Sequence, residues 1–201
     1  MKVLGLTGGI ASGKSTVSNR LREKHNAIVI DADKIAWELA EPHKPLWEKY
    51  VERYGDKILL PDGTLDRPAI GKIVFADKEE KKWTDDMAHP LIKNEILSRI
   101  EQHEGAGADI AVLDVPLLYE VHWEPLCDTV WVVYVDEETQ LRRLIERNGY
   151  TEQVARDRIA SQMAMAEKRA KADAVIDNMG SIDDTMRQVD DAWKRLKENK
   201  S

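Results

Sequence analysis

The feature that most constrains this chain is a glycine-rich segment near its N-terminus, Gly8–Ser15, with the sequence GGIASGKS. It fits the pattern G-x-x-x-x-G-K-[ST], the signature of a phosphate-binding loop, or P-loop. A short apolar run, Val3–Leu6, precedes the segment, and the stretch Thr16–Lys24 that follows it has helical character. A strand, a loop and a helix in this order limit the chain to α/β architectures with the loop at the carboxyl end of a strand.

Each part of the segment has a physical reason to bind phosphate. Glycines adopt backbone angles that other residues resist, so the loop N–H groups can turn toward an anion, and the N-terminus of the following helix adds its positive dipole end. In this pattern Lys14 contacts the β- and γ-phosphates and the Ser15 hydroxyl binds Mg²⁺. The alternative is a plain glycine-rich turn; a dinucleotide fingerprint, G-x-G-x-x-G, does not occur. The predicted nucleotide contacts are Gly8, Gly9, Ala11, Ser12, Gly13, Lys14, Ser15 and Thr16.

Short apolar runs predict the sheet. They are continuous rather than alternating and are rich in β-branched residues, which is typical of parallel strands covered on both faces. Helix-like stretches separate them, so we expect a three-layer α/β/α fold with a parallel five-stranded sheet and right-handed crossovers. The predicted strands are Val3–Leu6, Ala27–Ile30, Ile110–Leu113, Thr129–Val135 and Ala174–Ile176.

Two insertions interrupt this core. About eighty residues separate Asp31 from Ile110, far more than a crossover helix needs, and periodicity around Leu46–Tyr54 and Leu91–Ile100 indicates helices there. We predict a core of residues 1–40, 108–147 and 172–201, a helical insertion at 41–107 and a second insertion at 148–171.

Capping signals predict the helices near the second insertion. A helix should run from Glu137 to Arg147 and end at Asn148–Gly149, and Thr151 can cap a further helix reaching about Ala172. Ser181 should cap the C-terminal helix.

Two carboxylate positions lie at predicted strand ends, where open α/β sheets bind ligands. Asp33, in Asp31-Ala32-Asp33, is placed to accept a proton from an attacking hydroxyl, or it merely caps a helix starting at Lys34. Asp114 ends the run Ile110–Leu113 like the magnesium-binding aspartate that often accompanies a P-loop, although many strands end in aspartate.

Basic residues gather in the stretch 142–171, with eight Lys and Arg against four Asp and Glu. Most of these side chains could form a solvated surface, but an arginine-bearing flap beside a P-loop can clamp a phosphoryl group, and Arg147 is the best placed for this. In His89-Pro90, Pro90 is expected to open a helix, and His89 is either a residue at that helix start or a phosphate or ribose contact.

Composition excludes other classes. The formal net charge of −7 argues against nucleic-acid and anionic-membrane partners, and Cys127 is the single cysteine, so no disulfide framework is possible. There is no apolar run of transmembrane length and no signal-peptide core, so we expect a cytoplasmic protein.

Together, these residues resemble the dephospho-CoA kinase family over the whole chain. The strings that carry the resemblance are Leu4–Thr16, Asp31–Asp33, His89–Ile92, Asp114–Glu120, Arg158–Met163 and Ala172–Asn178. The first is generic to many nucleotide-binding proteins, whereas DVPLLYE and VIDN are much more selective.

The resemblance implies a P-loop kinase with a helical substrate domain at 41–107 and a lid at 148–171. We expect a monomer or weak homo-oligomer. It implies that ATP, with Mg²⁺, phosphorylates the ribose 3′-hydroxyl of dephospho-CoA. Asp33 would be the base, Lys14 and Arg147 would stabilise the phosphoryl group, and Arg147 and Asn178 would join the nucleotide contacts. Ser15 and Asp114 would bind the metal. The acceptor site would include Asp33, His89, Asp114, Leu117 and Leu118.

Three rival functions remain open on the sequence alone. A kinase of another small acceptor, such as a nucleotide, a sugar acid or a shikimate-like alcohol, would share the fold and the ATP site. A nucleotide switch is a second class, although no Asn-Lys-x-Asp guanine motif occurs. A non-catalytic scaffold is the third, and the intact Lys14-Ser15-Thr16 argues against it.

Overall fold

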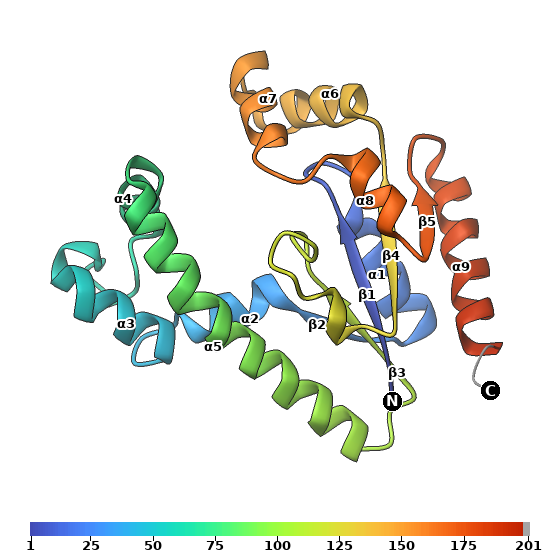
Figure 1. Ribbon diagram of the computed structural model, residues 1–201, viewed down its shortest axis with the longest axis horizontal. Helices are drawn as coiled ribbons and strands as arrows, with labels where there is room; N and C mark the ends of the chain where they lie inside the picture. Colours follow the sequence, from blue (N-terminus) through green and yellow to red (C-terminus); the bar gives the residue numbers. More distant parts are fainter. Residues whose placement is uncertain (199–201) are drawn as a thin grey trace. The chain divides into compact units, whose positions relative to one another are not determined.

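The computed structural model describes residues 1–198 (Figure 1). The chain divides into two compact units. The helical unit is Ile30–Ala106; the sheet unit comprises Met1–Val29 and the chain from Gly107 onward. Within residues 1–198, no helix combines the length and the apolar character needed to span a lipid bilayer.

A five-stranded parallel sheet forms the centre of the sheet unit, as predicted. The strands are β1 (Lys2–Gly8), β2 (Ile28–Asp31), β3 (Ile110–Asp114), β4 (Thr129–Tyr134) and β5 (Ala174–Asp177), in the spatial order β2-β3-β1-β4-β5. Strand β1 is central: Leu4 pairs with Val112 of β3 and with Thr129 of β4. The loop that follows β1 therefore starts from the middle of the sheet.

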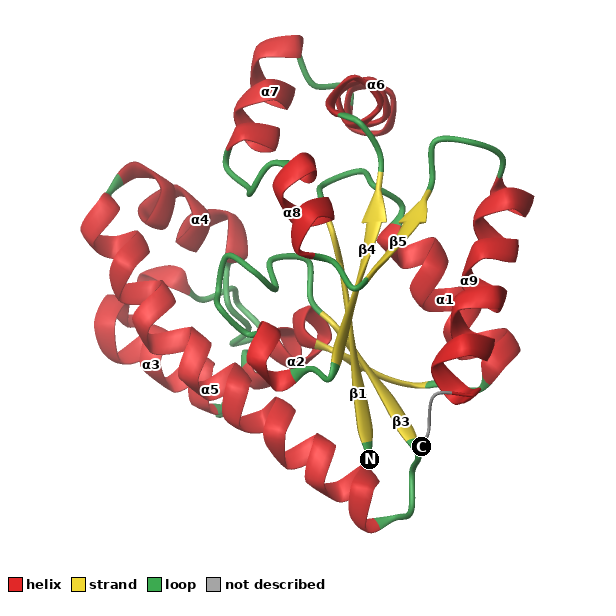
Figure 2. Ribbon diagram, turned by 45° about the vertical axis from the view of Figure 1, so that its right-hand side comes forward, coloured by secondary structure: helices red, strands yellow, loops and turns green. Residues whose placement is uncertain are grey.

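Helices cover both faces of this sheet (Figure 2). The helices of the sheet unit are α1 (Lys14–His25), α6 (Glu137–Asn148), α7 (Glu152–Ala160), α8 (Met165–Lys171) and α9 (Ile182–Glu198), with a short 3₁₀ turn η2 (Glu124–Leu126). Leu4 and Leu6 of β1 belong to one buried cluster with Val17 of α1 and Val189 of α9. The opposite face of β1, at Gly5, lies against the segment after β3, so the sheet is buried on both sides as its apolar runs predict.

The helical unit contains α2 (Ala32–Leu39), α3 (Pro45–Tyr54), η1 (Gly55–Ile58), α4 (Arg67–Ala76) and α5 (Lys78–Gly105). Its core is small and centres on Ile58, Leu65 and Ile70. Aromatic side chains extend this core: Tyr50 and Tyr54 of α3 stack on each other and meet the ring of Trp83 edge-on.

The prediction that Pro90 opens a helix is wrong. Pro90 lies inside the 28-residue helix α5, which begins at Lys78 behind the cap of Asp77. A proline in a helix interior removes one backbone donor, a cost of about 3 kcal/mol that packing can outweigh. Trp83, before Pro90, packs on α3, and Ile92 and Ile96, after it, are buried. These tertiary contacts stabilise the helix on both sides of the proline.

The prediction of one helix from Thr151 to about Ala172 is also wrong in part. Thr151 caps α7, and Ser181 caps α9 as expected, but α7 ends at Ala160 and α8 begins only at Met165. The intervening backbone and side chains make long-range hydrogen bonds, described below, which replace the helical pattern.

The possible capping role assigned to Asp33 belongs instead to Asp31. The Asp31 carboxylate accepts a hydrogen bond from the Lys34 N–H at 3.0 Å, and Asp33 is an exposed residue in the first turn of α2. Asp33 is therefore not the N-terminal cap of α2.

Candidate functional site

The loop between β1 and α1 has the backbone conformation that its glycines suggest. Gly13 has a φ of 87°, in the left-handed region, and Ala11 also has a positive φ, 59°. A Cβ at Gly13 would collide with the Asn178 amide nitrogen, and one at Gly8 would lie 2.5 Å from Ser12 Oγ. Only glycine fits these two positions without a shift of their neighbours.

Asn178, at the end of β5, holds this loop in place. Its Nδ2 donates to the Ser12 carbonyl at 2.8 Å, and its Oδ1 accepts from the Thr185 hydroxyl of α9 at 2.9 Å. Asn178 is buried, with 8% exposure. Its amide is thus occupied within the protein, so we interpret this predicted nucleotide contact as a support of the loop.

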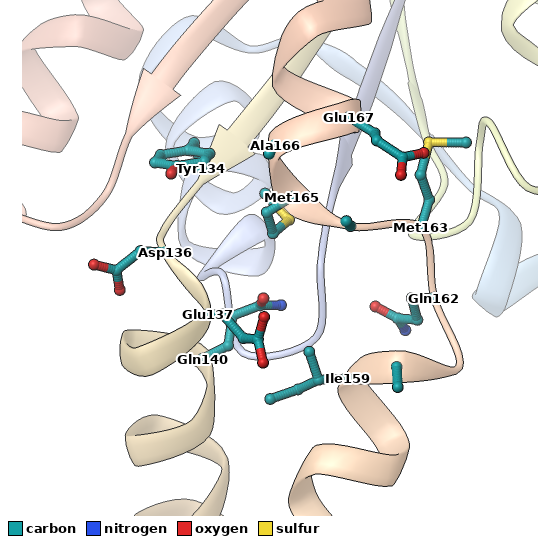
Figure 3. Close-up of a pocket in the computed structure, with 12 residues that line it drawn as sticks. Tyr134, Asp136, Glu137, Gln140, Ile159, Gln162, Met163, Met165, Ala166 and Glu167 are labelled. Atoms are coloured by element: carbon teal, nitrogen blue, oxygen red, sulfur yellow. The ribbon is translucent and has the colours of Figure 1, made fainter.

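Two glutamines fix the tip of the loop at Ile10. Gln140 of α6 donates to the Ile10 carbonyl, and Gln162, between α7 and α8, accepts the Ile10 N–H, both at 2.8 Å. Both side chains line a cavity of about 460 Å³, whose remaining wall comes from the ends of β4, α7 and α8. Figure 3 shows Gln140 and Gln162 on opposite sides of this cavity. The conformation of the loop therefore depends on residues 130 and 152 positions away.

The inner side of the loop carries unused donors. In the described chain, no acceptor lies against the backbone N–H groups of Ala11, Gly13, Lys14 and Ser15. The Ser12 hydroxyl is buried and also has no partner among residues 1–198. Buried polar groups normally find partners, and converging N–H groups at a helix N-terminus attract phosphate. The loop is therefore suited to bind the phosphates of a nucleoside triphosphate.

Lys14 and Asp114 form an ion pair beside the loop. Lys14 Nζ donates to Asp114 Oδ1, and the Asp114 side chain is only 4% exposed. Asp114 ends β3, which neighbours β1, so the sheet brings together two residues 100 positions apart. With the exposed hydroxyl of Ser15 in the first turn of α1, the arrangement offers the cation, carboxylate and hydroxyl expected for a magnesium–phosphate site.

The segment 114–120, named here the 114–120 loop, begins with the last residue of β3 and lies in the same region. The Thr7 hydroxyl donates to the Pro116 carbonyl at 3.0 Å. Leu117 is 37% exposed, whereas Leu118 is fully buried against Gly5. Burial fits Leu118 as a core residue better than as an acceptor contact. Desolvation raises the pKa of the neighbouring Tyr119 to about 12, so its phenol stays protonated.

Two predicted acceptor residues lie in the helical unit. Asp33 is in α2, and His89 lies in α5, with its Nε2 3.9 Å from the Asp85 carboxylate. The unit also holds a cavity of about 280 Å³ between α2, α3, α4 and α5, walled by Leu46, Ile70, Val74 and Ile92 among others. Thr84 lines it too.

The arginines of α6 differ in their surroundings. Arg147 is exposed in the last turn, and its Nε donates to the neighbouring Asn148 side chain at 2.9 Å. Arg143, one turn earlier, donates to the Asn178 carbonyl at 2.8 Å and lies 4.0 Å from where a Cβ at Gly13 would be. Arg143 is thus the α6 arginine nearest the loop.

Sequence reasoning missed several residues that shape this site. Gln140, Arg143, Gln162 and Lys168 belong to no phosphate-binding pattern and act through tertiary contacts. For Gln162 the available signal was its place in the string Arg158–Met163 that carries the family resemblance, and Arg143 and Lys168 lie in the basic stretch 142–171.

Comparison with known proteins agrees with this geometry. The family model described as Dephospho-CoA kinase matches residues 2–184. The dephospho-CoA kinase of Symbiobacterium thermophilum is 50% identical over 194 residues, covering 96% of this chain and 81% of the relative. That of Shouchella clausii is 47% identical over 94% of this chain and 95% of its own length. The solved dephospho-CoA kinase of Campylobacter jejuni superposes with a TM-score of 0.76 at 29% identity over 100% of both chains. On this evidence the chain belongs to the dephospho-CoA kinase family.

Proposed function

We propose that this chain transfers the γ-phosphoryl group of ATP to the ribose 3′-hydroxyl of dephospho-CoA, giving coenzyme A and ADP. The observation that carries the proposal is the loop after β1, with its unused N–H donors and the Lys14–Asp114 pair, in a member of this family. The transition state of phosphoryl transfer spreads negative charge over the γ-phosphoryl oxygens, so catalysis is chiefly positioning and electrostatics.

The β1–α1 loop binds the polyphosphate in this proposal. The N–H groups of Gly13, Lys14 and Ser15 donate to phosphate oxygens, supported by the dipole of α1. Lys14 turns from Asp114 to the β- and γ-phosphates and stabilises the charge that develops there. Gly8, Gly9, Ala11, Ser12 and Thr16 complete the predicted contacts.

Ser15 and Asp114 are the proposed protein ligands of Mg²⁺. No cluster of three or more His, Cys, Asp or Glu suited to a metal occurs in residues 1–198. Mg²⁺ in kinases is usually bound through one or two protein ligands together with substrate phosphates and water. When bound, the ion neutralises charge on the β- and γ-phosphates.

The acceptor side of the reaction is proposed for the helical unit. Asp33, exposed in the first turn of α2, accepts the proton of the 3′-hydroxyl as it attacks. The 41–107 stretch acts as the substrate domain, and its 280 Å³ cavity suits the apolar part of the dephospho-CoA arm. His89 and the exposed Leu117 are proposed as further acceptor contacts.

The lid is proposed to be residues 148–171, with Arg147 at its base. Arg147 is solvent-exposed, and a movement of the lid that brings it to the γ-phosphoryl group would add a cation there. Arg143 is a second candidate for ATP, since it already lies beside Gly13.

We further propose that the protein acts in the cytoplasm as a monomer or weak homo-oligomer, without nucleic acid or membrane. The net charge of −7 supports the absence of polyanionic partners, and the single cysteine fits a reducing compartment. Recognition of two anionic substrates by an acidic protein must then be local, at the β1–α1 loop and the basic stretch 142–171.

The deciding experiment is ADP release measured with a panel of acceptors: dephospho-CoA, AMP, shikimate, gluconate and water alone. Coenzyme A is the matched control, because its 3′-position already carries a phosphate. We expect turnover with dephospho-CoA alone and its loss by orders of magnitude in Lys14→Ala. Turnover only with another acceptor would identify a different small-molecule kinase, and hydrolysis without any acceptor would identify a nucleotide switch. The absence of both ATP binding and turnover would identify a scaffold.

A further inference from the structure

Lys168 of α8 is a buried cation that no step above uses. Its side chain has 0% exposure. The ammonium donates to the Pro116 carbonyl at 2.9 Å and pairs with Glu120 Oε1 at 2.8 Å. Burial lowers the pKa of Lys168, the Glu120 carboxylate opposes this, and the nearby charge of Lys14 lowers it further. The fold thus keeps a second lysine close to Lys14 at a position where its charge is costly.

The two partners of Lys168 lie on either side of one short loop. Pro116 follows Asp114 by two residues, and Glu120 closes the 114–120 loop. Glu120 Oε1 also accepts the backbone N–H of Met163 at 2.9 Å. Lys168 and Glu120 therefore connect the loop that begins at Asp114 with the segment that leads into α8.

Stability alone does not account for this pair. Buried ion pairs are often no more stabilising than apolar side chains of similar volume, because both charges lose their hydration. Moreover, Glu120 Oε2 is buried and no described residue bonds it, which adds a desolvation cost. A directional pair fixes the position of the Pro116 carbonyl, two residues after Asp114, which apolar packing does not do.

We propose that Lys168 is a positioning residue for phosphoryl transfer: by binding Pro116 and Glu120 it fixes the 114–120 loop, so that the Asp114 carboxylate is held opposite Lys14. This inference rests on the function proposed above, since Asp114 matters for the rate only if the site transfers phosphate. Lys168 acts through the loop and not by contact with substrate.

The test compares two variants. Lys168→Met removes the charge and leaves the partly buried Glu120 carboxylate without its cation, so it should lower both the melting temperature and kcat. Lys168→Met/Glu120→Leu removes both charges and keeps an apolar filling, so stability should recover toward the wild-type value. If the pair positions Asp114, the kcat of the double variant stays on the order of 10²-fold below the wild-type value, as expected for misplaced catalytic groups.

The readouts are kcat, KM for ATP and the melting temperature, with Lys194→Met as a control for removing a lysine, since its side chain is 77% exposed. We expect a reduced kcat with KM for ATP within about threefold in both variants, and wild-type values in the control. A kcat that recovers together with stability in the double variant would overturn the proposal, as would a wild-type kcat in Lys168→Met. Wild-type protein that shows no turnover with dephospho-CoA would instead refute the proposed function.

Discussion

Asn178 binds the carbonyl of Ser12 across 166 positions of sequence, with its Nδ2 2.8 Å from that oxygen. The same side chain accepts a hydrogen bond from Thr185 of α9, so one amide joins the β1–α1 loop, the end of β5 and the C-terminal helix. The loop is thus supported by a buried residue whose side-chain amide already binds Ser12 and Thr185.

Asn178→Ala should therefore weaken both folding and nucleotide binding. Truncation leaves the buried Ser12 carbonyl and Thr185 hydroxyl without this partner, a cost of about 1–3 kcal/mol. We expect a lower free energy of unfolding in urea and a Kd for ATP raised by about tenfold, equivalent to about 1.4 kcal/mol. Met179→Ala, at the exposed neighbour, should change neither. Unchanged unfolding of Asn178→Ala would show that the loop is held by other contacts.

Gly13→Ala separates backbone strain from steric collision. Gly13 and Gly149 both have positive φ, 87° and 66°, so alanine at either costs about 1–2 kcal/mol in conformation. A Cβ at Gly149 meets nothing within 4 Å, whereas one at Gly13 meets the Asn178 amide. Gly13→Ala should thus lose more stability than Gly149→Ala, measured by thermal unfolding, and should alone lose ATP binding, measured by calorimetry. Equal losses in the two variants would contradict the collision.

Asp33→Asn tests the proposed base against its neighbour in sequence. Asparagine cannot take the proton of the acceptor hydroxyl, so kcat should fall by about 10²–10⁴-fold with ATP affinity preserved. Asp31→Asn is the matched control, because asparagine caps a helix as well as aspartate and retains the bond to the Lys34 N–H. Normal turnover of Asp33→Asn would remove this residue from the chemistry.

Arg147→Ala should reduce turnover far more than stability. The side chain is exposed and its hydrogen bond is to the adjacent Asn148, so the free energy of unfolding should change by less than about 0.5 kcal/mol. If the lid brings Arg147 to the γ-phosphoryl group, kcat should fall on the order of 10²-fold. Arg142→Ala, which removes another exposed arginine of α6, serves as the control. A kcat at saturating ATP equal to that of the control would exclude the role.

Glu80 gives the helical unit a measurable pH dependence. Hydrogen bonds from Arg53, and then from Tyr54, lower the pKa of the Glu80 carboxyl to about 2. Because this pKa is depressed by folding, the stabilisation is complete above the unfolded value, about 4.3, and is lost as the pH falls toward 2. Glu80→Gln should therefore lower the melting temperature at pH 7 but progressively less below pH 4.

The control for this prediction is Glu52→Gln, which removes an exposed pair with Lys49. Its two side chains are 52% and 71% exposed, so little stability is at stake at any pH. A difference between Glu80→Gln and wild type that stays constant from pH 7 to pH 3 would show that charge plays no part at Glu80.

The sequence was informative where local chemistry decides the structure. All five predicted runs became strands because continuous β-branched residues suit a sheet buried on both faces. Thr151 and Ser181 cap helices as predicted, since capping depends on the first turn alone. The loop glycines and Lys14 could be assigned for the same reason.

Errors arose where distant contacts outweigh local preference. Pro90 reads as a helix start, yet packing on both sides of it sustains α5. The stretch after Ala160 looks helical, but Gln162 and Met163 use their polar groups on Ile10 and Glu120 instead. Arg143 and Lys168 read as surface residues of a basic stretch, and only the fold shows that one meets Asn178 and the other is buried.

The bond between Ile10 and Gln162 has a consequence for the nascent chain. Ribosomes make the chain from its N-terminus, so the glycine-rich loop is made before the residues that hold it. Its two clamps come from residues 140 and 162, and its support at Asn178 follows later still. Bringing together residues so far apart in the sequence costs conformational entropy, and only the contacts of the assembled sheet offset this cost. A growing polypeptide therefore carries the loop's residues without the loop's shape until residue 178 has been made, and ATP can stabilise the loop only after that point.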